Sequence, residues 1–175
     1  MIAKYVCCVS KKSWVFELRI YLLVILLLIG QHAYSEETLC TEKEKIIFSC
    51  HVEKKIVSLC ISLQPNQNLI YRYGKLEHVE LMYPETGNQH NSDFHRSSNM
   101  LFGGEETSIT FKRSAYEYKI YSKIGRVDDD NHQKNRTPMY EDGLEIYQNG
   151  KSLKQLVCTD GGEGFRADIS WIPNL

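Results

Sequence analysis

Cysteine is the residue type of this chain that can take part in the most kinds of reaction. Four of the six cysteines lie beyond residue 35: Cys40, Cys50, Cys60 and Cys158. A cysteine thiolate can bind a metal ion, attack a substrate or form a disulfide. Zinc sites usually pair cysteines about two to four residues apart, whereas these four follow one another at intervals of ten, ten and 98 residues. The spacing therefore favours disulfides, provided that the chain reaches an oxidising compartment.

The N-terminal segment predicts such a compartment. Its first 19 residues include four basic side chains, and an unbroken apolar run follows from Ile20 to Gly30. The small residues Ala33 and Ser35 then stand at the spacing that a signal peptidase recognises. We expect residues 1–35 to be a signal peptide, cleaved after about Ser35, and residues 36–175 to form one periplasmic domain. The alternative is an uncleaved anchor, although eleven apolar residues are few beside the roughly 20 that span a bilayer.

Charge narrows the range of partners. Residues 1–35 hold four of the 21 basic and one of the 22 acidic residues of the chain, so the mature part keeps 17 and 21, a net charge near −4. This balance argues against nucleic acid or an anionic membrane as a partner, and it mildly favours a cationic protein. We expect contact with the membrane only through the signal segment.

The mature part has the pattern of an all-β protein. Short apolar–polar alternations recur and no long helical period appears. The expected hairpins cover residues 45–62, 69–83, 107–122 and 144–158. In the last, Asn149–Gly150 predicts a type I′ turn, with Ile146 opposite Leu153 and Glu145 opposite Lys154. We expect about eight antiparallel strands in a small barrel or two-sheet sandwich.

The cysteines are expected to staple this domain. A turn at Glu53–Lys54 would point Cys50 and Cys60 to opposite faces of the first hairpin, which disfavours a bond between them. Four cysteines allow three pairings, and of these we favour Cys40–Cys60 with Cys50–Cys158.

The chain shows none of the common catalytic or metal-binding motifs. G-x-S-x-G, H-E-x-x-H and the phosphate-binding P-loop are all missing. The acidic run Asp128–His132 lacks the alternating spacing of a calcium loop, so we interpret it as a solvated loop. His90 and His95 share a long loop, but they lack ligand spacing. We therefore expect no catalytic residue, no metal and no cofactor.

Several short motifs resemble those of small exported, disulfide-containing β proteins of Gram-negative bacteria. These motifs are a C-x9-C run that ends in FSC, the following C-x-S, and then YRYGKLEHVELMYP, AYEYKIYS and NGK…LVC. Proteins of similar build include periplasmic lysozyme inhibitors and immunity proteins of type VI secretion effectors, which block a cell-wall or membrane hydrolase. The chain lacks the S-G-x-x-Y loop of C-type lysozyme inhibitors, which argues against lysozyme as the target. No family site residue carries over.

We therefore expect a periplasmic inhibitor or immunity protein that blocks a toxic peptidoglycan- or phospholipid-degrading hydrolase. The long polar segment Pro84–Glu106 is expected to be a loop that enters the enzyme's cleft. The candidate contacts are Phe94, His95, Met100, Phe102 and, in the tail, Trp171. The alternatives are a minor envelope enzyme with paired carboxylates, which a cluster of buried acids would favour, and a ligand-carrying β-barrel, which a closed apolar cavity would favour.

Overall fold

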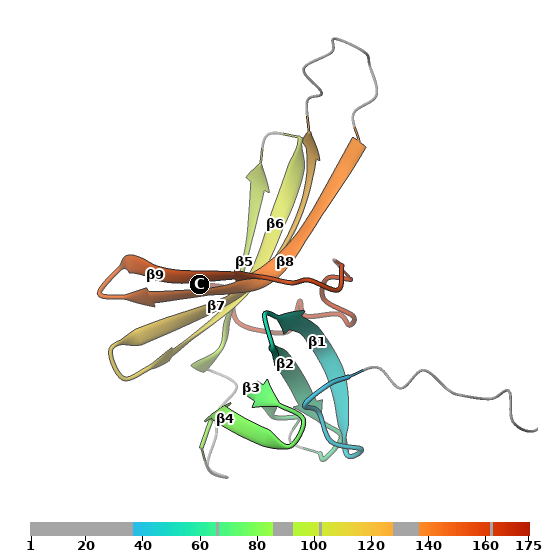
Figure 1. The fold of residues 1–175 in the computed structure, drawn as a ribbon, viewed down its shortest axis with the longest axis vertical. Helices are drawn as coiled ribbons and strands as arrows, with labels where there is room; N and C mark the ends of the chain where they lie inside the picture. Colours follow the sequence, from blue (N-terminus) through green and yellow to red (C-terminus); the bar gives the residue numbers. More distant parts are fainter. Residues whose placement is uncertain (1–36, 66, 86–92, 102, 128–136, 162) are drawn as a thin grey trace, which may run out of the picture. The chain divides into compact units, whose positions relative to one another are not determined.

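Nine antiparallel strands form two sheets in the computed structural model, which describes residues 37–175 apart from 66, 86–92, 102, 128–136 and 162. The first sheet contains β1 (Glu44–Val52), β2 (Lys55–Ser62), β3 (Leu69–Lys75) and β4 (His78–Tyr83). The second contains β5 (His95–Leu101), β6 (Gly104–Arg113), β7 (Tyr116–Val127), β8 (Thr137–Gln148) and β9 (Lys151–Val157). In both sheets the strands lie in sequence order (Figure 1). The all-β prediction is confirmed, in the form of a two-sheet sandwich.

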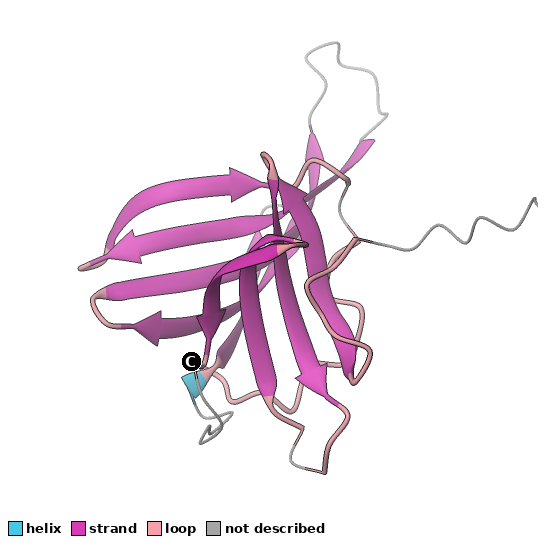
Figure 2. Ribbon diagram, turned by 60° about the horizontal axis from the view of Figure 1, so that its bottom comes forward, coloured by secondary structure: helices cyan, strands magenta, loops and turns pink. Residues whose placement is uncertain are grey.

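The inner faces of the two sheets enclose a core rich in aromatic side chains. The strands of the first sheet run across those of the second (Figure 2). Phe111 on β6 lies between the rings of Tyr83 and Tyr118, with centroids 4.6 and 5.0 Å away, and it also contacts Tyr71 at 4.8 Å. The core is filled by such rings and by branched aliphatic side chains from both sheets. The end of the long strand β7 and the start of the long strand β8 extend beyond the first sheet (Figure 1).

Strand β5 corrects the prediction that residues 84–106 form a loop. Its backbone pairs with β6 from His95 opposite Thr110 to Leu101 opposite Gly104. The sequence HRSSNML has no apolar–polar alternation, because this strand lies at the edge of the sheet and contributes little to the core. Backbone pairing alone makes it a strand, and a side-chain pattern does not reveal such pairing.

The first and the last hairpin form at the turns that the sequence predicts, but the register of the last one is wrong. Val52 pairs with Lys55 around Glu53–Lys54, and both Asn149 and Gly150 adopt positive φ, at 51° and 74°. A bulge between Ile146 and Tyr147 then shifts the last hairpin by one residue. Ile146 consequently pairs with Lys154 and Glu145 with Gln155, instead of Leu153 and Lys154.

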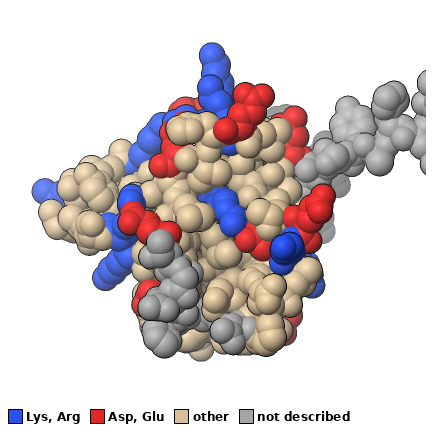
Figure 3. Space-filling model, turned by 90° about the horizontal axis from the view of Figure 1, so that it is seen from below, with Lys and Arg blue, Asp and Glu red and all other residues tan. Residues whose placement is uncertain are grey.

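The surface carries charges of both signs side by side. In the view of Figure 3, lysine and arginine side chains lie next to aspartate and glutamate side chains, and neither sign gathers into a broad patch. Most of these charges belong to local ion pairs, such as Lys55 with Glu80 at 2.6 Å. On the face that this view shows, charges of the two signs are therefore mixed.

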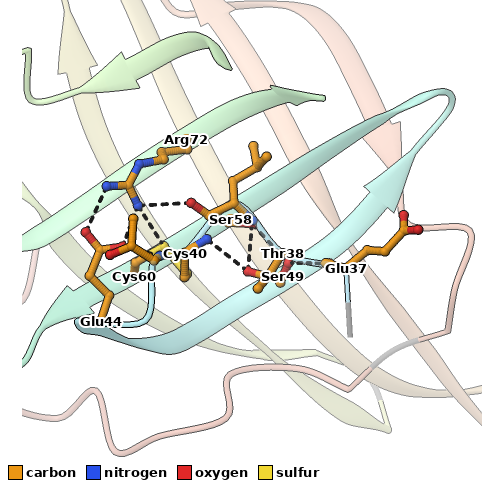
Figure 4. Close-up of a disulfide and its surroundings, with 10 residues drawn as sticks. Glu37, Thr38, Cys40, Glu44, Ser49, Ser58, Cys60 and Arg72 are labelled. Atoms are coloured by element: carbon orange, nitrogen blue, oxygen red, sulfur yellow. Dashed lines mark hydrogen bonds and ion pairs between the residues drawn. A yellow bond between two sulfur atoms is a disulfide. The ribbon is translucent and has the colours of Figure 1, made fainter. Parts of the chain in front are cut away.

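Both predicted disulfide pairings are present. Cys40 is bonded to Cys60, 20 residues further along, and Cys50 to Cys158 over a separation of 108 residues. The first bond fixes the segment before β1 onto the outer face of the first sheet, where Leu39 is buried (Figure 4). The second joins β1 to the residue that follows β9. Two such bonds are typical of proteins in an oxidising, exported environment.

A buried ion pair completes the cover on this outer face (Figure 4). Arg72 on β3 donates two hydrogen bonds to Glu44, at 2.6 and 2.8 Å, and a third to the carbonyl of Leu39 at 3.1 Å. Burial raises the pKa of Glu44, but the hydrogen bonds and charge of Arg72, together with the Thr41 N–H, outweigh burial and leave the pKa lowered. Glu44 is thus held as a carboxylate beside the disulfide.

The C-terminal tail, residues 159–175, covers the outer edge of β1 and one side of the core. The N–H groups of Thr159 and Arg166 donate to the carbonyls of His51 and Ile47, at 2.9 and 2.8 Å. Ile169 and Ile172 then insert into the core. Covering an edge strand in this way protects it from pairing with another chain. Among the residues that the structure describes, no helix has the length and apolar character to cross a bilayer.

Candidate binding surface

Phe94 is a core residue, which makes its expected role as a surface contact wrong. Only 1% of its surface is exposed, and its ring packs against those of Tyr83 and Phe111 at 5.7 and 5.3 Å. The segment around it is polar, so the sequence suggested an exposed loop. In the structure, Phe94 attaches the start of β5 to the core.

The remaining expected contacts do not gather at one place. His95, half-buried, lines a hollow of about 280 Å³ together with Tyr83 and Asp93. Met100 is 86% exposed at the other end of β5, roughly 16 Å away at the rise of a strand. Trp171, 41% exposed, lies in the tail beside a different hollow. Phe102 is outside the described residues, as are His90 and the run Asp128–His132.

Along its strands, the inner face of the second sheet changes from buried apolar side chains to small polar ones and then to large exposed ones. Three cross-strand rows follow from the pairing of β5 to β8. The first row lies in the core and includes Ile109, Ile120 and Leu144. The second row is small and polar, and consists of Ser98, Thr107, Ser122 and Asp142. The third row, which we call the outer row, consists of Met100, Glu105, Ile124 and Tyr140.

The outer row leaves large apolar side chains in solvent. Met100, Ile124 and Tyr140 are 86, 50 and 57% exposed, although they point to the same side of the sheet as the core. They lie where β5 to β8 project past the first sheet (Figure 1). Scattered exposed apolar residues are ordinary, whereas neighbours on one face of a sheet are typical of a surface that binds another protein.

A hollow of about 380 Å³ lies beside the outer row, and we call it the tail groove. The sheet contributes Glu105, Thr107, Ser122 and Ile124, and the tail contributes residues 163–165 and 167–169. The tail is anchored here because the N–H of Gly164 donates to Asp142 Oδ2 at 2.7 Å. The small side chains of the second row leave the space that the groove occupies. The tail groove and the outer row together form the candidate binding surface.

The sequence contained a signal for this surface. Leu144 and Ile146 alternate on β8, and extending that alternation backwards by two and four residues places Asp142 and Tyr140 on the same face. We instead expected residues 126–138 to be a polar stretch between strands. The tail groove had no such signal, because it depends on where the tail packs.

A cluster of acids does occur, on the opposite face of the second sheet. Lys119 forms ion pairs with Glu106 and Glu145, at 2.7 and 3.2 Å. Lys123 forms ion pairs with Glu106 and Glu141, both at 3.5 Å. Burial raises the pKa of Glu145, but Tyr147 and Lys119 outweigh it and lower the pKa. A general acid needs a raised pKa near neutrality. These lysine-paired carboxylates therefore have the character of a structural ion-pair network.

His51 connects the two covering segments of the first sheet. Its Nε2 lies 2.8 Å from Glu37 Oε2 and its Nδ1 lies 2.8 Å from Asp160 Oδ2. The hydrogen bonds to Asp160 and Glu37 raise the pKa of His51 above its ordinary value. When protonated, the imidazolium ties the segment before β1 to the start of the tail.

Stability should fall as the pH rises through the range in which His51 loses its proton. The folded-state pKa is raised, so its contribution is complete below the unfolded pKa, near 6.5, and disappears as the pH passes the folded pKa. Urea unfolding between pH 5 and 9 should show this decline in the wild type and a shallower one in His51→Gln. Parallel curves for the two proteins would contradict this account of the pairing.

No protein-family model, no curated protein and no solved structure matches this chain.

Proposed function

We propose that this chain is a periplasmic binding protein that neutralises a toxic hydrolase by steric block, as an immunity protein does. The observation that carries the proposal is the outer row, where Met100, Ile124 and Tyr140 offer apolar area beside a groove. Aromatic residues and methionine are enriched in the buried centres of protein interfaces. Both disulfides fit an exported protein, and the Cys50–Cys158 bond fixes the start of the tail that forms one wall of the groove.

The mechanism is occlusion of an active site by a rigid surface. Strands β5 to β8 present the outer row on a paired β-sheet, so binding orders little backbone and its entropic cost is low. The projecting ends of these strands would enter or cover the cleft of a peptidoglycan- or phospholipid-degrading enzyme. We prefer a binding function to the enzyme alternative because the acids of the cluster, Glu106, Glu141 and Glu145, are each paired with a lysine.

The experiment isolates envelope proteins that the mature domain retains, identifies any hydrolase among them and measures inhibition of that purified enzyme. We expect inhibition at one-to-one stoichiometry. The double variant Ile124→Ser/Tyr140→Ser should raise the inhibition constant by roughly 1,000-fold, because each interface hot spot contributes about 2 kcal/mol.

The matched control is Leu153→Ser/Val157→Ser on β9, whose side chains are 54 and 45% exposed, close to those of the outer row. It should inhibit like the wild type. The proposal fails if no retained hydrolase is inhibited. Equal losses in the two variants would show that the outer row is not the contact.

A further inference from the structure

The tail groove brings several acidic side chains together. Among its described lining residues, Glu105, Glu163 and Asp168 are acidic and none is basic. All three side chains are exposed, and like charges around one concave surface add to the negative potential there. The groove therefore attracts cations more strongly than the mixed-charge surface of Figure 3.

The three carboxylates differ in how far neighbouring residues neutralise them. Glu163 has a cationic partner, Arg166, at 2.9 Å. Glu105 accepts hydrogen bonds from the hydroxyls of Ser98 and Thr107, which carry no charge. Asp168 accepts a hydrogen bond from the Ser170 N–H at 2.9 Å. Hydrogen bonds from neutral groups keep a carboxylate ionised without cancelling its charge.

The pKa of Asp168 supports this reading. The hydrogen bonds from Ser170 lower it, and the more distant charge of Arg96 adds to the effect. Asp168 is consequently ionised throughout the neutral range. The groove keeps a negative surplus next to the apolar side chains of Ile124 and Ile169, so the ligand that fits it combines a cation with apolar area.

We propose that the tail groove receives an arginine or lysine side chain from a loop of the partner protein, while apolar residues of the same loop cover Ile124 and Tyr140. Charge complementarity selects this occupant, and the inference rests on the proposed protein-binding function. Arginine fits better than lysine, because its planar fork can donate two parallel hydrogen bonds to one carboxylate.

Short peptides test the groove without the partner. The probes are N-acetylated, C-amidated pentapeptides that differ only at the centre: Gly-Leu-Arg-Leu-Gly and its glutamine and glutamate counterparts. They are titrated into the ¹⁵N-labelled mature domain with its disulfides intact. The arginine peptide should shift the amide signals of Ser122, Ile124 and Gly164. It should bind at least tenfold more tightly than the glutamine peptide and lose that advantage in high salt.

The decisive variant is Glu105→Gln/Asp168→Asn, which keeps both hydrogen-bond acceptors and leaves the pair of Glu163 and Arg166 in place. It should reduce arginine-peptide binding to the level of the glutamine peptide. The control Glu42→Gln/Glu77→Gln makes the same change in net charge at exposed positions outside the groove and should have no effect. A dispersed amide spectrum confirms that each variant is folded.

The inference is overturned if the arginine peptide shifts no groove signal, or if its affinity is the same in the decisive variant. Its failure is distinguishable from failure of the proposed function. A hydrolase whose inhibition depends on the outer row but not on Glu105 and Asp168 would leave the function standing and remove the cationic contact. Peptide binding in the groove without any inhibited hydrolase would support the cationic contact and contradict the proposed function.

Discussion

Replacing both Cys50 and Cys158 with alanine is expected to lower the free energy of unfolding by about 4–5 kcal/mol. The bond closes a loop of 108 residues, and the chain-entropy model assigns roughly 4.7 kcal/mol to a loop of about that length. It also fixes the start of the tail, whose Ile169 and Ile172 pack into the core. Guanidinium unfolding of the purified domain measures the loss.

The second disulfide supplies the matched comparison. The loop between Cys40 and Cys60 spans only 20 residues, so the corresponding double alanine variant should lose about 3 kcal/mol. Limited proteolysis should cut the tail first in the Cys50→Ala/Cys158→Ala variant. Equal losses, or a tail that stays protected when that bond is removed, would contradict its assigned role.

Replacing Arg72 with methionine should cost about 3–5 kcal/mol, because it leaves the buried Glu44 carboxylate without its partner. The side chains of Arg72 and Glu44 are only 11 and 8% exposed. The double variant Arg72→Met/Glu44→Leu should recover most of the loss, since an apolar pair avoids burying a charge. Chemical denaturation of the three proteins at pH 7 makes the comparison.

Lys55 and Glu80 provide the control for this prediction. Their ion pair is shorter than 3 Å but about one-third exposed, so Lys55→Met should destabilise the protein far less than Arg72→Met does. The pH dependence adds a second check. The pKa of Glu44 is lowered in the folded state, so its stabilisation is present above the unfolded pKa and disappears as the pH falls through the folded pKa. Arg72→Met should weaken this loss in acid; an unchanged acid profile would contradict it.

The sequence was most informative where a local rule determines the structure. The Asn149–Gly150 turn formed as expected, because these two residues tolerate positive φ. The Glu53–Lys54 turn also formed, although Glu53 takes a φ of 56° that glutamate seldom adopts. The same hairpin geometry separated Cys50 from Cys60 and so removed one of the three possible pairings, but no local rule distinguished the correct pairing from the other that remained. Bulges follow no comparable rule, which is why the pairing of Ile146 was off by one residue.

The candidate surface depended on contacts between distant segments. Phe94 looked like a loop residue because its neighbours are polar, yet packing against Tyr83 and Phe111 placed it in the core. Met100 and Trp171 were expected to contact the partner; the structure shows both exposed, but it places them in different parts of the molecule. The tail groove exists because the tail, held by the second disulfide, lies against β6 and β7. The residues of its two walls lie far apart in the sequence, so no short stretch of sequence indicates the groove.

The most direct test of the account is photocrosslinking from the outer row in living cells. A photoreactive phenylalanine analogue replaces Tyr140 in one strain and Leu153 in another, at positions that are 57 and 54% exposed. The account predicts a covalent adduct with a cell-envelope hydrolase from position 140 and none from position 153. Adducts with the same protein from both positions, or from position 153 alone, would contradict it, as would a strain in which position 140 captures no hydrolase.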